Sequence, residues 1–336
     1  MSGAVAAQST PATDVVTIRD LSVEFAGRQQ PARALRHVDL TVPRGTILGI
    51  VGESGSGKST LAMAIMGLLP NSARIAGGSI RLGARELVGL PERALRDLRG
   101  TRMSMIFQDP MTALNPVRTV GCAMLDVQYR DKHLTRAARW QRSVDLLRKV
   151  GIPDPERQVN RYPHQFSGGM RQRIAIAMAL LGKPELLIAD EPTTALDVTL
   201  EAQILHLLRS IRAELDGSII FISHNLGAIA EICDHVAVLY AGEVVERGPV
   251  RELFHDPRHP YTRALLACDP ARIAAASRQL PTIPGEVPNP ARLPAGCAFA
   301  DRCGSAMDIC RVIPPSAHAI APGRDARCHL MEASGS

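Results

Sequence analysis

A glycine-rich segment near the N-terminus has the residues needed to hold a chain of phosphates. Residues 52–60 read Gly-Glu-Ser-Gly-Ser-Gly-Lys-Ser-Thr and fit the pattern G-x-x-x-x-G-K-S/T completely. The glycines let backbone N–H groups wrap the phosphates, while Lys58 should reach the β- and γ-phosphates and Ser59 should place its hydroxyl on Mg²⁺. The residues expected to contact the nucleotide in this loop are Gly52, Ser54, Gly55, Ser56, Gly57, Lys58, Ser59 and Thr60.

Two adjacent carboxylates, Asp190 and Glu191, end a run of four apolar residues at 186–189. On its own this pair would be better explained as a helix cap after a core strand. Beside a phosphate loop the pattern favours chemistry. We expect Asp190 to hold Mg²⁺, directly or through water, and Glu191 to polarise the attacking water as a general base.

A second small-residue turn, Ser167-Gly168-Gly169, precedes an apolar helix over 174–181. A helix that begins on such a turn offers backbone N–H groups and the positive end of its dipole to an anion. The turn lies about 110 residues after the phosphate loop and just before the carboxylate pair. The chain therefore has two segments suited to phosphate.

An α/β core must position these groups. Apolar stretches at Val15–Phe25, Val38–Val42, Ile47–Val51, Met103–Phe107 and Ser218–Ile222 predict strands, as does the run before Asp190. Strands that alternate with helices favour a parallel sheet with ligands at the strand ends. Residues 115–161 are helical and charged in pattern, which predicts an inserted helical subdomain over about 112–165. We expect a disordered lead-in over 1–14, a nucleotide-binding domain over 15–260 and a C-terminal extension over 261–336.

Composition limits the other possibilities for this chain of 336 residues. Hydrophobic residues make up 46% but aromatics only 3%, so the core must be aliphatic. No apolar run reaches the ~18 residues of a membrane span, and the N-terminus lacks the pattern of a signal peptide, which favours a cytosolic protein. The net charge of +6 comes from scattered arginines. Compositional bias explains the scattered arginines better than a nucleic-acid or membrane-surface patch does, so no nucleic-acid partner is expected.

Taken in order, the motifs from about Val15 to Pro260 resemble the ATP-binding subunits of ABC transporters. The resemblance implies a P-loop NTPase of ABC type with an antiparallel β subdomain, an inserted helical subdomain and a Cys-bearing C-terminal extension. It implies that Gln108 contacts Mg²⁺ and the water, that His224 contacts the γ-phosphate, and that Phe25 stacks on adenine. It also implies that Ser167, Gly168 and Gly169 serve the ATP of a second subunit, with Asp197 of the segment 195–197 at the dimer contact.

Three further segments resemble the dipeptide and oligopeptide importer branch of that family. They are residues 105–116, residues 259–266, and a tail containing 282–288 and 296–303. The branch implies ATP hydrolysis that energises peptide import at the cytoplasmic face of the inner membrane. The implied partners are two membrane permeases, a second ATPase forming a hetero-dimer and, indirectly, an extracytoplasmic substrate-binding protein. Nickel or glutathione import is an alternative within the branch. A soluble ABC ATPase in translation or DNA repair is the alternative class.

Four cysteines gather in the tail: Cys297, Cys303, Cys310 and Cys328. Gaps of five, six and seventeen residues match neither zinc ribbons nor standard ferredoxin runs. Four thiolates can nevertheless enclose a 4Fe–4S cluster, and the branch resemblance also points to iron–sulfur. The tail is poor in core-forming residues, which favours some metal without choosing one. Zinc or reduced thiols without metal remain open.

Overall fold

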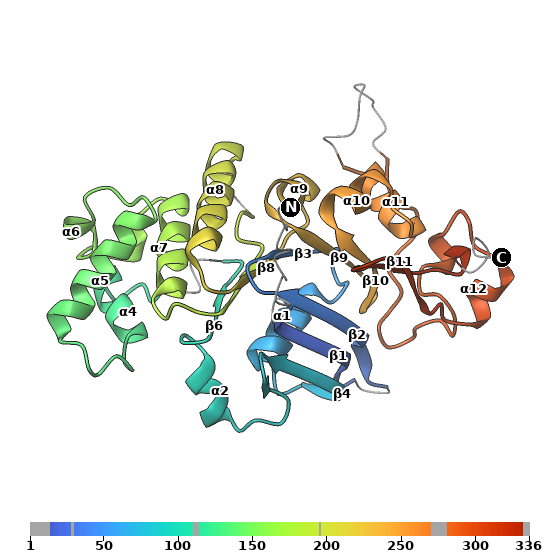
Figure 1. The fold of residues 1–336 in the computed structure, drawn as a ribbon, viewed down its shortest axis with the longest axis horizontal. Helices are drawn as coiled ribbons and strands as arrows, with labels where there is room; N and C mark the ends of the chain where they lie inside the picture. Colours follow the sequence, from blue (N-terminus) through green and yellow to red (C-terminus); the bar gives the residue numbers. More distant parts are fainter. Residues whose placement is uncertain (1–13, 28–29, 110–113, 195, 270–280, 332–336) are drawn as a thin grey trace, which may run out of the picture.

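An eight-stranded sheet forms the centre of the molecule in the computed structural model (Figure 1). The structure describes residues 14–27, 30–109, 114–194, 196–269 and 281–331, so the expected lead-in falls almost wholly outside the described residues. The strand order is β11-β12-β10-β9-β3-β8-β7-β6. The strands are β3 (Ile47–Val51), β6 (Met103–Ile106), β7 (Leu186–Asp190), β8 (Ser218–Ile222), β9 (His235–Tyr240), β10 (Glu243–Pro249), β11 (Ala317–Ala321) and β12 (Arg324–Arg327).

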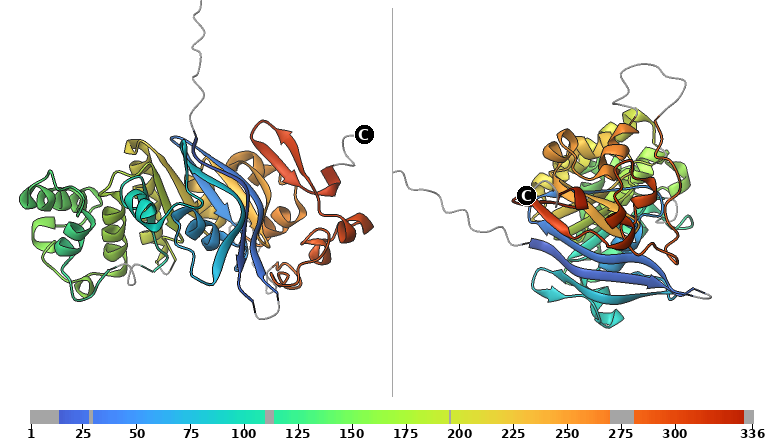
Figure 2. Two further views of the ribbon diagram at one scale, coloured as in Figure 1. Left: turned by 90° about the horizontal axis from the view of Figure 1, so that it is seen from below. Right: turned by 90° about the vertical axis from the view of Figure 1, so that its right-hand side faces the viewer.

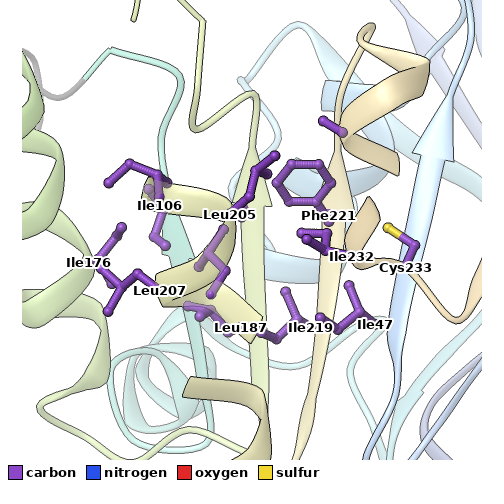
Figure 3. Close-up of a cluster of buried hydrophobic side chains, with 14 of the residues drawn as sticks. Ile47, Ile106, Ile176, Leu187, Leu205, Leu207, Ile219, Phe221, Ile232 and Cys233 are labelled. Carbon is purple, nitrogen blue, oxygen red and sulfur yellow. The ribbon is translucent and has the colours of Figure 1, made fainter. Parts of the chain in front are cut away.

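The five strands from β9 to β6 pair in parallel and are buried on both faces. Successive side chains of a strand point to opposite faces, so a strand covered on both sides must be apolar throughout. In β8, Ile219 and Phe221 join one core cluster, while Ile220 and Ile222 join the other. Figure 3 shows the first cluster, where Leu187, Ile219 and Phe221 lie near Ile176 of α7 and Leu205 of α8.

Two layers cover the large sheet. On one face lie α1 (Lys58–Met66) and a four-stranded antiparallel sheet, whose strands are β2 (Ala32–Pro43), β1 (Asp14–Phe25), β4 (Ala73–Leu82) and β5 (Arg85–Glu86) (Figure 2). On the other face lie α7 (Gly168–Leu180), α8 (Val198–Glu214) and α9 (Leu226–Ile232). The predicted α/β core with an antiparallel β subdomain is confirmed.

The helices of the predicted insert lie to one side of the sheet (Figure 1). They are α4 (Val120–Val127), α5 (Arg136–Lys149) and α6 (Pro155–Gln158), and α7 follows them; α2 (Glu92–Leu98) precedes β6. Thr119 and Thr135 cap α4 and α5 by accepting hydrogen bonds from backbone N–H groups of the first turn. No helix in the described part of the chain is long and apolar enough to cross a membrane.

The C-terminal extension shares the large sheet. After α10 (Val250–His255) and α11 (Pro260–Ala267), the chain returns through α12 (Asp308–Val312) to β11 and β12. Strand β12 pairs antiparallel with β10, with Ala326 opposite Glu246. The extension and the nucleotide-binding core are thus joined by backbone hydrogen bonds. The domain limits expected at residues 15 and 260 stay predictions.

Candidate functional site

The predicted phosphate loop opens on a cleft of about 470 Å³. Residues from distant parts of the chain line it together with the loop. The predicted site residues that line the cleft are Ser54, Gly55, Gly57, Lys58, Ser59, Thr60, Gln108, Glu191 and His224. Since β3, β7 and β8 are parallel neighbours, the loops after their carboxyl ends meet at one edge of the sheet. The remaining loop residues, Gly52 and Ser56, are buried.

The loop conformation requires glycine at two positions. Gly52 has φ of 152°, and a Cβ there would lie 2.2 Å from the carbonyl oxygen of Leu239. Gly57, which precedes α1, has φ of 108°, and a Cβ would lie 2.8 Å from the carbonyl oxygen of Ala34. Both the backbone angle and the space exclude a side chain. The nine-residue helix α1 then starts at Lys58 and directs its N-terminus at the cleft.

Lys58 is held against its own loop. Its Nζ donates to the carbonyl oxygens of Gly52, at 2.7 Å, and Glu53, at 2.9 Å. Only 7% of the residue is exposed, and burial lowers the pKa of its ammonium, while Glu191 and Asp190 oppose that shift. A buried ammonium with two neutral partners lies near two carboxylates, so the site is suited to a polyanion that brings further negative charge.

Asp190, the predicted Mg²⁺ ligand, is buried and is not among the residues that line the cleft. The residue is 5% exposed, its carboxylate accepts a hydrogen bond from Ser59, and its Oδ1 is buried with no hydrogen-bond partner among the described residues. Burial raises the pKa of this carboxyl, with the hydrogen bond from Ser59 opposing. Carboxylate and hydroxyl oxygens are ligands that Mg²⁺ prefers, so the predicted pair Ser59 and Asp190 fits that ion.

We expect Asp190→Asn to raise the free energy of unfolding of the nucleotide-free protein at pH 7 by about 1 kcal/mol. A raised pKa in the folded state means that the protonated form is favoured by folding, so stability is lost as pH rises through the folded pKa. The amide removes that charge. The gain should vanish below about pH 4, where the native carboxyl is also protonated.

Thermal unfolding at several pH values would measure this effect. Asp216→Asn is the control, because the Asp216 side chain is 97% exposed and should change stability little. A destabilised Asp190→Asn protein at pH 7 would contradict the account. Mg²⁺-dependent hydrolysis should be lost in the same variant, since one metal ligand is weakened.

The carboxylate of Glu191 lies within 3.4 Å of three other polar side chains. Its Oε2 accepts hydrogen bonds from Gln108 Nε2, at 3.1 Å, and Thr194 Oγ1, at 3.0 Å, and lies 3.4 Å from His224 Nδ1. The residue has φ of 47°, an unusual backbone angle for glutamate, and its N–H donates to the carbonyl oxygen of Ile222 in β8. The strained turn directs the carboxylate to the cleft. Of these partners, Gln108 and His224 were predicted, whereas Thr194 was not.

The second small-residue turn lies elsewhere. Ser167 caps α7, with its hydroxyl accepting from the Met170 N–H at 3.4 Å, and Gly168 is exposed. Ser167, Gly168 and Gly169 do not line the cleft formed by the described residues of this chain. This helix start is therefore not part of the cleft that contains Lys58. The service of these residues to a second subunit stays a prediction.

Two other predicted residues are also placed outside the cleft. Phe25 ends β1 and lines a different hollow with Glu24 and Arg74, and it packs partly against the core. Asp197 is exposed and caps α8 by accepting from the Leu200 N–H at 2.9 Å, while Ala195 lies outside the described residues. Adenine stacking by Phe25 and a dimer contact at Asp197 stay predictions.

Sequence reasoning missed one side of the cleft. The additional lining residues are Arg33, Ala34, Ala241, Pro288, Pro290 and Leu293. Arg33 and Ala34 lie in β2, and the last three come from the proline-rich segment before the cysteines. No motif marks them, since each contributes through its place in the fold.

The predicted 4Fe–4S cluster, with its iron–sulfur assignment, is wrong. Cys297, Cys303, Cys310 and Cys328 line one small apolar cavity, but no group of three or more His, Cys, Asp or Glu side chains within the described ranges is arranged to hold a metal ion. The cavity has about 10 Å³ of free space, roughly that of one water. Burial raises the pKa of the Cys297 thiol to about 11, which disfavours the thiolate that a cluster needs.

Two family models match this chain. One, described as ABC transporter, covers residues 35–194. The other, described as Oligopeptide/dipeptide transporter, C-terminal region, covers residues 245–310. The first range contains the phosphate loop, the small-residue turn and the carboxylate pair. The second contains most of β10, the proline-rich segment and three of the four tail cysteines.

Similar proteins span nearly the whole chain. A probable peptide ABC transporter ATP-binding protein of Sinorhizobium fredii is 48% identical over 96% of this chain and 96% of its own length. The oligopeptide transport ATP-binding protein OppD of Salmonella typhimurium is 48% identical over 95% of this chain and 94% of its own length. Among solved structures, a dimeric post-hydrolysis state of the ATP-binding cassette MJ0796 with ADP and Pi is 27% identical with a TM-score of 0.63, covering 70% of this chain and 99% of that one.

Proposed function

Because this chain belongs to the ABC transporter family and is an ABC-type ATPase, we propose that it hydrolyses ATP to drive import of oligopeptides or dipeptides through partner membrane permeases. The observation that carries the proposal is the match of residues 245–310 to the C-terminal region of oligopeptide and dipeptide transporters, together with an intact phosphate loop. The ATPase fold alone would suit any transported substrate.

The cleft suggests how each residue takes part in hydrolysis. Backbone N–H groups of the loop would cradle the phosphates, and Lys58 would turn from its loop carbonyls to the β- and γ-phosphates. Ser59 and Asp190 would hold Mg²⁺, which neutralises charge on the β- and γ-oxygens when bound. Glu191 would take a proton from the attacking water, with His224 close to the transferred phosphoryl group.

Gln108 connects the carboxylate to the edge of the molecule. Its amide donates to Glu191, and Gln108 is an exposed residue that follows β6 closely. A shift of the Gln108 backbone would move a hydrogen-bond donor of the general base. We infer that this is how a membrane partner changes the ATPase rate.

A closed dimer would complete the site. The cleft of one chain supplies donors to one side of the γ-phosphate, whereas its Ser167, Gly168 and Gly169 stand apart from it. In the proposed dimer these residues contact the ATP bound by the other subunit. ATP would then stabilise the closed state, and hydrolysis would release it.

The proposed setting is the cytoplasmic face of the inner membrane, with two permeases and an extracytoplasmic binding protein. A second, different ATPase is the proposed dimer partner. Nickel or glutathione import would use the same residues, but the relatives named for peptide transport support the peptide substrate. A soluble ATPase of translation or DNA repair is disfavoured by the C-terminal match.

Uptake by whole cells tests the proposal. Deletion of the gene should reduce uptake of labelled di- and oligopeptides to background, and the intact chain should restore it. Nickel and glutathione uptake in the same strain are the controls and should stay unchanged. If peptide uptake stayed unaltered while uptake of nickel or glutathione was lost, the proposed substrate class would be contradicted.

A further inference from the structure

We propose that residues 288–293 of the proline-rich segment form the wall of the ATP site that contacts the nucleoside. The inference rests on the proposed binding of ATP at the phosphate loop. Pro288, Pro290 and Leu293 line the same cleft as Lys58 and Glu191, although about 230 residues separate them from Lys58 in the chain. We call this wall, together with Arg33 and Ala34, the nucleoside wall.

The nucleoside wall borders the end of the phosphate loop that leads into α1, and the polar side chains that contact Glu191 come from other segments. The N–H of Arg33 donates to the carbonyl oxygen of Pro290 at 2.9 Å, which joins β2 to the segment beside the blue β1–β2 hairpin (Figure 2). The carbonyl oxygen of Ala34 is the nearest atom to a Cβ built on Gly57, at the end of the loop that leads into α1. If Glu191 faces the γ-phosphate, the other end of the ligand extends toward this wall.

The segment is anchored to the main core. Ile283 and Val287 pack partly against that core, as does Leu293, which also lines the cleft. Pro288 is half-buried and Pro290 is exposed. An anchored backbone with apolar rings toward the cleft presents a fixed surface to a ligand.

Arg302 ties the segment to the phosphate loop. Its guanidinium donates to the carbonyl oxygens of Pro284, at 2.8 Å, and Ile283, at 3.3 Å. The same group forms a bidentate ion pair with Glu53 at 2.8 and 2.9 Å, and its side chain is 5% exposed. The Tyr261 hydroxyl accepts a hydrogen bond from the N–H of Glu53 at 2.9 Å. Arg302 therefore joins residues 283–284, which precede the wall in the same segment, to Glu53 of the phosphate loop.

The chemistry of the wall suits a base and its sugar. Proline rings are apolar, rigid and free of N–H groups, so they can cover an aromatic base without competing for hydrogen bonds. Because the wall is already ordered, binding would cost little conformational entropy. Phosphates gain little from the side chains of Pro288, Pro290 and Leu293, since anions need donors or cations. The wall should therefore distinguish a nucleotide from a bare phosphate chain.

The test compares MgATP with inorganic tripolyphosphate in the full-length protein. Isothermal titration should show that Pro288→Ala with Pro290→Ala weakens ATP binding roughly fivefold, the loss expected for about 40 Å² of apolar contact. Tripolyphosphate affinity should not change. Leu293→Ala is a second variant with the same expected pattern. Pro281→Ala with Glu286→Ala is the matched control, because both residues are exposed parts of the segment that do not line the cleft.

Tripolyphosphate also reports whether each variant is folded. Equal weakening of both ligands would overturn the proposal, because the segment would then only support the loop. Unchanged ATP affinity in both wall variants would overturn it as well. Failure of the proposed ATP site would be visible in the unsubstituted protein, which would then not bind ATP.

Discussion

Replacing Glu191 with glutamine is expected to lower the rate of ATP hydrolysis by about 10²–10⁴-fold, the range for loss of a general base. Glutamine keeps the length of the side chain and can still accept from Gln108 and Thr194, which contact Glu191 Oε2 in the native protein. It cannot accept the proton of the attacking water. The variant should bind ATP and remain in the ATP-bound dimer.

Two measurements on purified protein would check this result. Phosphate release should be near background, while size-exclusion chromatography with ATP should show an increased dimer fraction. Glu214→Gln is the control, since Glu214 ends α8 and its side chain is 61% exposed in a surface pair with Lys149. Unchanged turnover in Glu191→Gln would remove Glu191 from the catalytic role.

Replacing Gly168 with aspartate is expected to reduce hydrolysis by at least about 10²-fold, the effect of removing one donor from a charged transition state. A Cβ on Gly168 would meet no atom within 4 Å, so the side chain has room. A carboxylate at the first position of α7 interacts favourably with the helix dipole, so the free energy of unfolding should not decrease. The same charge would repel a phosphate brought to this turn by a second subunit.

This variant distinguishes whether Gly168 contacts the ATP bound by its own chain or the ATP bound by a second subunit. Monomeric Gly168→Asp should bind ATP with the affinity of the native chain, because Gly168 does not line that chain's cleft. In a Glu191→Gln background it should abolish the ATP-dependent dimer. Gly168→Ala, which adds a methyl without charge, should retain most activity. Weakened ATP binding by the monomer would place the turn in the site of its own chain and contradict the dimer model.

Local patterns predicted four of the five parallel strands, β3, β6, β7 and β8. The expected limits of β3 and β8 agree with the structure, because strands buried on both faces must be continuous apolar runs. Strands β9 and β10 were missed, and the sequence of β10 explains its omission. It contains Glu246, which is completely buried and whose two carboxylate oxygens accept from the N–H groups of Arg258 and His259. A charged residue in a strand is satisfied here by partners that no local window contains.

For the four tail cysteines, the sequence predicted a metal site that the structure contradicts. The four tail thiols do line one cavity, but spacing along the chain carried no information about free volume. The space between side chains depends on how β12, α12 and the preceding loop pack. The 4Fe–4S prediction, made from residue type and from the family resemblance, was therefore wrong.

The sequence by itself determined the phosphate loop, the carboxylate pair and most of the central strands, since backbone conformation within a few residues and side-chain periodicity are local properties. Tertiary structure alone decided which groups share the cleft. It brought Gln108, His224 and Thr194 to Glu191, kept Ser167 to Gly169 away, and placed Pro290 beside Arg33. These contacts join segments far apart in the chain, and their formation depends on the packing of the whole sheet.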